Sequence, residues 1–434
     1  MASNSNTAAD GPPATKPPMR LHYGFVVLTL VVMAVFGSLG LARFGYTSVL
    51  PAMQDSLGLT NTQAGQLQSW NLLGYLLTVV LAGVLATRYG PRVVISVSLF
   101  VTATALILTG LIPTFRGACV ARFLAGVGGA GANVPAMAML SAWFGARRRG
   151  LAAGAGVAGS SVGLMVTGPL VPAVLGYYGP EGWRFCWYVL GILSMIVCLL
   201  CALFLRNRPQ DMGLLPLGQS PDETLRRQTA LPASALQWSL VYRSRYLWHL
   251  AGVYFAFGFS YIIYATFFIR YLVKEGALTE SDAGLIWLRI GLVSGLSGFI
   301  WGGVSDRWGR RLALLLVFAS QSISFLVFGW SRDLRMVYLS AALFALTAWS
   351  IPALMAALSG DIFGPRLAPA ALGLMTVVFG IGQTLGPYLA GRIADAANSF
   401  SPAFLMAGLV ALVIGAGGSL LLRPPHRTPH HQTT

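Results

Sequence analysis

Charged residues are scarce in this chain, and acidic residues are the scarcest. Only 10% of its 434 residues are Asp, Glu, Lys or Arg, and the 13 acids face 29 bases, for a formal net charge of +16. A soluble domain carries about 25% charged residues. The shortage excludes a cytosolic enzyme. The bases lie between apolar runs and form no basic face interleaved with aromatics, so no nucleic-acid partner is expected.

Cysteine is also rare, which excludes a secreted disulfide scaffold. The four cysteines, Cys119, Cys186, Cys198 and Cys201, all lie inside apolar runs. The last two have the spacing of a C-x-x-C redox motif, but no βαβ pattern surrounds them. We interpret all four as small packing residues, and we expect neither a metal site nor a cofactor.

Apolar runs of about twenty residues recur along the whole chain, and the mean hydropathy is +0.69. Each run can cross the roughly 30 Å hydrocarbon core of a bilayer as a helix. The sequence therefore predicts an all-α polytopic membrane protein. Its twelve spans are expected at about 24–50, 62–86, 93–112, 116–141, 150–175, 183–205, 247–273, 282–304, 311–330, 335–359, 369–393 and 402–422.

One long polar stretch, residues 206–246, separates the sixth run from the seventh. We interpret it as a cytoplasmic linker between two six-helix bundles. The bundles are placed at 21–205 and 247–422, with a disordered cytoplasmic segment at 1–20 and a cytoplasmic tail at 423–434.

Basic residues lie mostly on one side of these spans. With both termini inside, the inner segments hold 19 Lys or Arg and the outer segments seven. Short cytoplasmic loops carry the excess of bases in membrane proteins. The bias predicts cytoplasmic termini and a multi-pass protein of the cell membrane, in a bacterium the inner membrane.

The two halves share an internal repeat. The segment GVLATRYGPR at 83–92 matches GGVSDRWGRR at 302–311, 219 positions later, and a glycine-proline pair at 168–169 matches one at 386–387. Parallel repeats are one of the plans of secondary transporters. The two bundles should therefore be pseudo-symmetric.

These motifs resemble those of the major facilitator superfamily of transporters, and the similarity covers about 24–422. The family's loop motif, G-x-x-x-D-R-x-G-R-R/K, is complete after the eighth span, whereas Thr87 replaces its Asp after the second. Arg122-x-x-x-Gly126 resembles the fourth-helix motif. The fifth-helix motif, which is tied to exporters, is only partly matched, so the direction of transport stays open.

Two further segments are similar to a poorly characterised bacterial branch of that family. They are LARFGYT at 41–47 and FGFSYIIYATF at 257–267. More loosely, the whole chain resembles the oxalate and monocarboxylate carriers. The resemblance implies two bundles that rock about a central site.

Three arginines fall inside the expected spans: Arg43, Arg122 and Arg289. An arginine near the bilayer centre costs from about 2.5 to more than 10 kcal/mol, so it persists where it meets a wet cavity or a partner. No Asp or Glu lies deep in any expected span. A negatively charged substrate would supply the missing counter-charge.

Each arginine has more than one interpretation. In the resembled carriers an eighth-helix arginine binds the substrate carboxylate, which implies this role for Arg289, because a guanidinium can meet a carboxylate with two hydrogen bonds. Snorkelling to the interface is its alternative. Arg43 is expected to bind substrate or act in a gate, against snorkelling or pairing with Asp55. Arg122 is either a helix-packing residue or a functional one.

Aromatic residues recur along one face of the seventh span, at steps of three and four residues. Three of them carry hydroxyls that would be costly facing lipid, so a cavity wall is favoured over simple packing. This face comprises Tyr254, Phe257, Tyr261, Tyr264 and Phe268. Other polar candidates, which could instead be interhelical hydrogen bonds, are Gln68, Asn71, Asn133 and Gln383.

Charged residues at the inner ends of the spans could form a gate. The first half lacks the acids of the second, so we predict a one-sided lock that holds the carrier open to the outside, with Asp306 at its centre. Its candidate members are Asp306, Arg307, Asp361, Arg366 and, from the first half, Arg88.

Two glycine-proline pairs, Gly168-Pro169 and Gly386-Pro387, are candidate bends or helix-packing points. An interior proline removes a backbone hydrogen bond, and glycine permits close approach of two helices.

Together these features predict a secondary transporter, not an enzyme. It would move a small organic anion, a carboxylate, by alternating access, as proton symport or anion exchange. A multidrug or other exporter is one alternative, although it would favour a buried acid, and a transporter-like ligand sensor is another. We expect a monomer in the lipid bilayer.

Overall fold

The computed structural model describes residues 22–218 and 242–422. The expected terminal segments, 1–20 and 423–434, lie outside these residues, as does the middle of the 206–246 linker. Within the described part of the chain, twelve helices are long and apolar enough to cross a membrane. The twelve-span, all-α prediction is confirmed.

The first half contains six spans, and a π-helical segment divides the first of them. Its elements are α1 (Tyr23–Val35), the π-helix η1 (Phe36–Phe44), α2 (Gly45–Ser56), α3 (Asn61–Tyr89), α4 (Pro91–Leu111), α5 (Phe115–Trp143), α6 (Ala146–Tyr178), the 3₁₀ turn η2 (Gly179–Glu181) and α7 (Gly182–Phe204). A second 3₁₀ turn, η3 (Pro209–Met212), follows them.

The second half also supplies six spans. Its elements are α10 (Arg245–Lys274), α11 (Glu280–Trp308), α12 (Arg310–Trp330), α13 (Leu334–Thr347), α14 (Ser350–Ala397), α15 (Ser401–Val410), the π-helix η4 (Ala411–Ala416) and α16 (Gly417–Leu420). α14 contains parts of two spans. They are separated at Gly364, which adopts a non-helical conformation with φ 71° and ψ 168°. Glycine reaches this conformation without a steric penalty.

Local sequence signals explain several helix ends. α3 begins with a capping box in which Thr60 and Gln63 bond each other's backbone N–H groups. α3 and α11 end at Gly90 and Gly309, with φ of 84° and 93°. These glycines hold the same place in the internal repeat, so both copies of the loop motif make the same turn.

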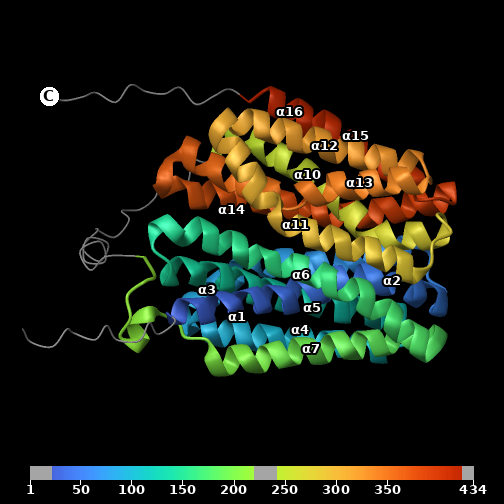
Figure 1. Ribbon diagram of the computed structural model, residues 1–434, viewed down its shortest axis with the longest axis horizontal. Helices are drawn as coiled ribbons and strands as arrows, with labels where there is room; N and C mark the ends of the chain where they lie inside the picture. Colours follow the sequence, from blue (N-terminus) through green and yellow to red (C-terminus); the bar gives the residue numbers. More distant parts are fainter. Residues whose placement is uncertain (1–21, 219–241, 423–434) are drawn as a thin grey trace, which may run out of the picture.

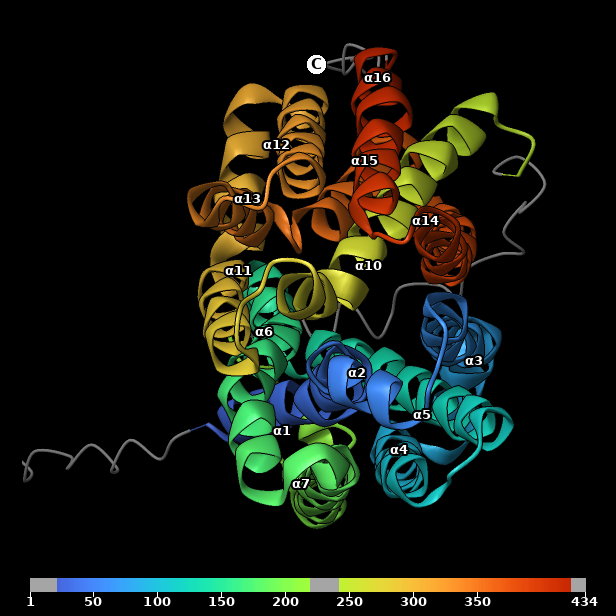
Figure 2. The ribbon, with the colours of Figure 1, turned by 90° about the vertical axis from the view of Figure 1, so that its right-hand side faces the viewer.

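The two halves form two bundles that lie side by side along the length of the molecule (Figure 1). Figure 2 looks along the helices and shows the first half, blue to green, below the second half, yellow to red. The halves meet where α6 packs on α11, α3 on α14 and α2 on α10. We call the end at which Leu205 and Arg245 lie the linker end, and the other the opposite end.

Polar bonds join the two halves at the opposite end. The carboxylate of Asp395, on α14, accepts hydrogen bonds from the backbone N–H groups of Asn61 (2.9 Å) and Thr62 (2.8 Å). It therefore caps the start of α3 from the other bundle. Lys274 and Asp55 form an ion pair nearby, between α10 and α2. These contacts hold the two bundles together at the opposite end.

Candidate functional site

A cavity of about 220 Å³ lies between the two bundles. Its walls come from α1, η1, α3, α5 and α6 of the first half and from α10 and α14 of the second. The polar and aromatic side chains that line it are Arg43, Phe44, Tyr75, Asn133, Ser160, Tyr254, Phe257, Tyr261, Trp349, Thr376, Phe379 and Gln383. No Asp or Glu is among the described residues of this lining, so Arg43 carries its formal charge.

Arg43 lies in the last turn of η1, and short π-helical segments are frequent at functional sites. Its side chain is only 5% exposed, and its guanidinium carbon lies 4.5 Å from the centre of the Tyr75 ring. It also interacts with the hydroxyl of Tyr261, from the other half. Nε and Nη2 of Arg43 are buried without a hydrogen-bond partner. The cavity therefore holds a cation with one unpaired edge.

Arg122 lies behind this site and is fully buried. Its Nη1 donates to the carbonyl oxygen of Ala42 (2.6 Å), the residue before Arg43, and its Nη2 donates to Oε1 of Gln68 (2.8 Å). Its guanidinium carbon lies 4.6 Å from the ring centre of Tyr46. Arg122 therefore fixes the backbone of η1 that carries Arg43.

The two cavity amides each donate to a tyrosine. Asn133 Nδ2 donates to the hydroxyl of Tyr75 (2.9 Å), and Gln383 Nε2 donates to the hydroxyl of Tyr261. The first pair belongs to the first bundle and the second pair to the second bundle. The structure thus places Asn133 and Gln383 in the cavity wall, each already holding a hydroxyl in position.

Four aromatic rings of the second half form one wall, and their planes are nearly parallel. The rings of Tyr254 and Phe379 are 4.4 Å apart at 15°, and those of Phe257 and Tyr261 are 4.6 Å apart at 15°. Tyr254 and Phe257, like Tyr261 and Phe379, lie at 1° to each other. We call Tyr254, Phe257, Tyr261 and Phe379 the aromatic wall.

The sequence analysis missed six of these twelve lining residues: Phe44, Tyr75, Ser160, Trp349, Thr376 and Phe379. Tyr75 follows Asn71 by four residues on α3, and Phe379 precedes Gln383 by four on α14. Such pairs lie on one face of a helix, so the spacing could have found both. Trp349 stands at the break between α13 and α14, where no helical period indicates its direction.

Tyr264 does not line the cavity, contrary to the expectation from its place on the seventh span. Its hydroxyl bonds to Oγ of Ser340 at 2.8 Å, and its ring packs on Phe325 and Phe344. It lies one turn nearer the opposite end than Tyr261, and there α10 is enclosed by its own bundle. Phe268, one further turn along, packs on Phe328.

Arg289 is likewise outside the cavity, on an exposed face of α11. Leu285, Leu292 and Leu296 share that face and are 42%, 58% and 58% exposed. Nη1 of Arg289 accordingly bonds the hydroxyl of Tyr338 at 2.9 Å, on α13. This geometry favours the snorkelling alternative over substrate binding in this conformation.

Two α3 amides proposed as polar candidates serve as links to α5. Asn71 Nδ2 donates to the carbonyl oxygen of Arg122 (3.1 Å), where a Cβ on Gly126 would clash with the Asn71 carbonyl. Gln68 accepts from Arg122, as described above. For Asn71 the structure therefore favours the interhelical hydrogen bond over the expected contact with substrate.

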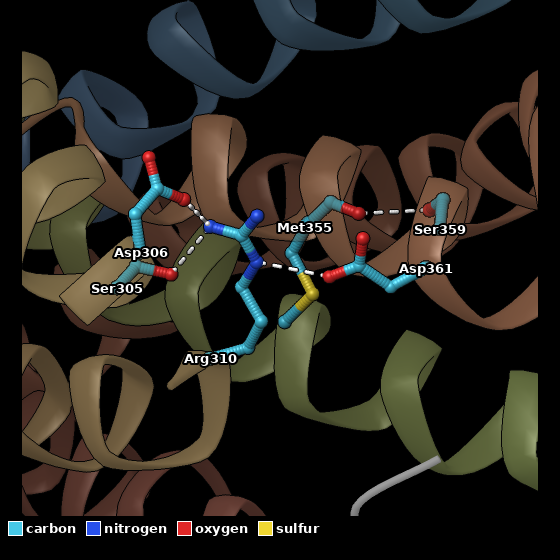
Figure 3. Close-up of polar contacts among 6 residues, drawn as sticks. All are labelled: Ser305, Asp306, Arg310, Met355, Ser359 and Asp361. Carbon is cyan, nitrogen blue, oxygen red and sulfur yellow. Dashed lines mark hydrogen bonds and ion pairs between the residues drawn. The ribbon is translucent and has the colours of Figure 1, made fainter. Parts of the chain in front are cut away.

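Charged residues at the linker end meet through Arg310, a residue that the sequence analysis left out (Figure 3). Its Nη1 lies 2.6 Å from Oδ1 of Asp306 and 2.8 Å from Oγ of Ser305, and its Nε lies 3.0 Å from Oδ2 of Asp361. Arg310 follows Asp306 by four residues, across the turn at Gly309. We call Asp306, Arg310 and Asp361 the linker-end cluster.

Two other bases expected in this network make no contact with it among the described residues. Arg307 is exposed, and Arg88 lies over the ring of Tyr89, its neighbour in the chain. The side chain of Arg366 lies outside those that the structure describes. The two expected acids are therefore joined, but by a different arginine.

Comparison with known proteins identifies the family. A family model described as "Uncharacterised MFS-type transporter YbfB" matches residues 34–419. The chain belongs to the major facilitator superfamily (MFS). It is 27% identical over 401 residues to the probable sulfoacetate transporter SauU of Cupriavidus necator, across 88% of this chain and 90% of that protein.

Two further likenesses support this MFS assignment. The hexuronate transporter of Bacillus subtilis is 25% identical, across 92% of this chain and 94% of that protein. A solved bacterial homologue of the human lysosomal transporter Spinster, inward-facing and unoccupied, superposes with a TM-score of 0.73 at 18% identity, covering 92% of this chain and 96% of that one. The protein is a multi-pass membrane transport protein and not an enzyme, and the solved structure shows the shared fold.

The glycine-proline pairs of this MFS chain lie at helix contacts. A Cβ on Gly168 would clash with the carbonyl oxygen of Gly284, across the two halves, and a Cβ on Gly386 would lie 2.8 Å from the Phe259 carbonyl. The carbonyl of Pro387 touches Gly65 of α3. The packing interpretation therefore fits, and α6 and α14 continue as helices through both pairs.

We predict that the linker-end cluster contributes to the transport rate of this MFS protein. Arg310→Gln removes both ion pairs, and Arg307→Gln, three residues away, removes an exposed charge without touching the cluster. Exposed pairs contribute about 0–1 kcal/mol, so we expect nearly unchanged melting temperatures in both variants. We expect Arg310→Gln to reduce the transport rate several-fold more than Arg307→Gln. Equal rates in the two variants would show that the cluster has no part in the cycle.

Proposed function

We propose that this MFS protein is a secondary transporter of a small organic anion, and that Arg43 binds the anion. The observation that carries the proposal is the unpaired guanidinium edge of Arg43 beside a cavity without described acids. Taking a charge out of water costs several kcal/mol unless a partner compensates it. An anion in the cavity supplies that partner.

The relatives support an anionic substrate. Sulfoacetate and hexuronate, named for the two curated relatives, are both organic anions. A cationic drug, in contrast, would meet the charge of Arg43 and find no described acid in the cavity lining. An exporter of cationic drugs would therefore lack a matching acid among the described lining residues.

The arrangement of the halves suggests how the substrate gains access. The linker end, on the side with more bases, is proposed to face the cytoplasm. The contacts of Asp395 and Lys274 would then lie on the outer side, and we propose that this arrangement corresponds to an inward-facing state of an alternating-access cycle. Because no carboxyl group is described in the cavity, a coupling proton would travel with the substrate, or a second anion would exchange for it.

Transport in proteoliposomes tests the proposal. Vesicles containing the full-length protein are loaded with unlabelled carboxylates, and uptake of labelled carboxylates is measured with and without an inward proton gradient. We expect saturable uptake of at least one anion, stimulated by the gradient or by internal anion. Uptake of lipophilic cations without uptake of any anion would overturn the proposal.

A further inference from the structure

We propose that the preferred substrate is a flat monoanion, with one carboxylate on a planar, weakly polar body such as an aromatic ring. This inference rests on the proposed function and adds a substrate class to the same cavity. Four features carry it: the edge offered by Arg43, the commitment of the other polar groups, the aromatic wall and the size of the cavity.

The charge of the cavity matches one carboxylate. Nε and Nη2 form one edge of a guanidinium, and two parallel N–H groups on such an edge match the two oxygens of a carboxylate. Both atoms are unpaired in Arg43. Arg43 is the one Lys or Arg among the described lining residues. A second carboxylate on the ligand would therefore be buried without a cation, which is unfavourable.

Several other polar groups of the lining are already used within the protein, whereas the hydroxyls of Ser160 and Tyr254 make no hydrogen bond with the described residues. The amide nitrogens of Asn133 and Gln383 donate to tyrosine hydroxyls. Trp349 Nε1 donates to Oγ of Ser161 at 2.9 Å, and the Thr376 hydroxyl donates to the carbonyl oxygen of Leu372 at 2.7 Å. A ligand with many hydroxyls would lose its water and find few free partners. The cavity therefore selects against sugar acids.

The aromatic wall favours a flat ligand. Its four rings lie within 15° of parallel in every pair for which they make contact. A planar ligand aligned with them gains offset-stacking contacts, which are favourable at centre-to-centre distances of about 4.5–7 Å. The cavity of about 220 Å³ is also below the range of about 300–1,000 Å³ typical of drug-sized ligands. One ring with a short acidic group suits both its shape and its size.

Four probes separate charge, flatness and polarity in a binding assay on the purified full-length protein. Benzoate is flat with one charge, terephthalate is flat with two, galacturonate has one charge and several hydroxyls, and benzyl alcohol is flat and neutral. Dissociation constants are measured by calorimetry. We expect benzoate to bind at least about tenfold more tightly than each of the others, because each lacks one matching feature.

Two matched variants locate the selectivity. Phe379→Leu removes one ring of the aromatic wall, whereas Phe325→Leu makes the same change in the bundle core outside the cavity. We expect Phe379→Leu to weaken the binding of benzoate severalfold more than the binding of galacturonate. Phe325→Leu should leave the ratio of the two dissociation constants unchanged. If galacturonate or terephthalate binds more tightly than benzoate in an Arg43-dependent way, this inference is overturned while the proposed function stands. If no anion binds, both fail.

Discussion

Arg43→Gln is expected to lower the affinity for the transported anion by about 30-fold or more. Removing one partner of a buried, hydrogen-bonded charge pair costs about 2–5 kcal/mol, and each 1.4 kcal/mol is a factor of about ten in a dissociation constant. Glutamine retains hydrogen-bonding capacity but is shorter than arginine and carries no charge. Calorimetry on the purified protein measures the change. Arg43→Lys should retain part of the affinity, because an ammonium keeps the charge but lacks the planar edge.

Arg43→Gln is expected to weaken anion binding but not to destabilise the protein without ligand. Without a ligand, Arg43 is a buried cation with an unpaired edge, so a neutral side chain should leave the melting temperature unchanged or raise it. Arg122→Gln is the matched control. It would leave the carbonyl of Ala42 and the amide of Gln68 without their donor, so we expect a loss of about 2–4 kcal/mol and a lower melting temperature.

Both measurements can contradict the role of Arg43. Unchanged anion affinity in Arg43→Gln would remove Arg43 from the binding site. A fall in melting temperature as large as that of Arg122→Gln, without ligand, would show that Arg43 is a structural residue. The two arginines lie close together in the first bundle, so the contrast between their variants separates binding from support of η1.

The fold was predictable from sequence because the membrane imposes one dominant signal. Twelve apolar runs long enough to span a bilayer leave a helix as the structure that satisfies their backbone groups. The repeat at 83–92 and 302–311 then indicated two similar bundles, and the shared turns at Gly90 and Gly309 have the geometry that a duplicated motif requires. The break at Gly364, with its positive φ, was not predicted.

The site was only partly predictable, because a helix period does not indicate which face meets a cavity. Arg43 and Arg289 both stand among apolar residues inside a span, but one lies beside the cavity and the other on the exposed leucine face. Tyr261 and Tyr264 share a stripe, yet only Tyr261 lines the cavity. Where the bundles separate along a helix depends on contacts with other helices, which the local sequence does not contain.

Arg310 shows a second limit. Its four-residue distance from Asp306 was visible, but its bond to Asp361 on α14 depends on how two helices far apart in the chain meet. The polar bonds of Asp395 with the start of α3 have the same origin. These polar contacts at both ends of this molecule join elements that are distant in sequence. Alternating access would require contacts between the two bundles to form and break.

Gly168→Leu is expected to block closure of the opposite end and to abolish transport. A Cβ on Gly168 would clash with the carbonyl oxygen of Gly284, where α6 meets α11. Because the clash lies between the two bundles, each bundle can still fold, and the molecule should shift to a state open at that end. Gly176→Leu is the matched control on the same helix, since a Cβ there meets no described atom within 4 Å.

Labelling of a single introduced cysteine measures this opening. Thr47 lies one helical turn from Arg43 toward the opposite end and is 1% exposed, and its hydroxyl donates to the carbonyl oxygen of Ala265 across the halves. The native cysteines are buried. We expect a maleimide to label Thr47→Cys at least about tenfold faster when Gly168→Leu is added, since a buried thiol reacts only when the structure opens. Gly176→Leu should leave the labelling rate unchanged. Slow labelling together with normal transport in Gly168→Leu would contradict this prediction. It would show that closure of the opposite end does not require glycine at the contact between α6 and α11.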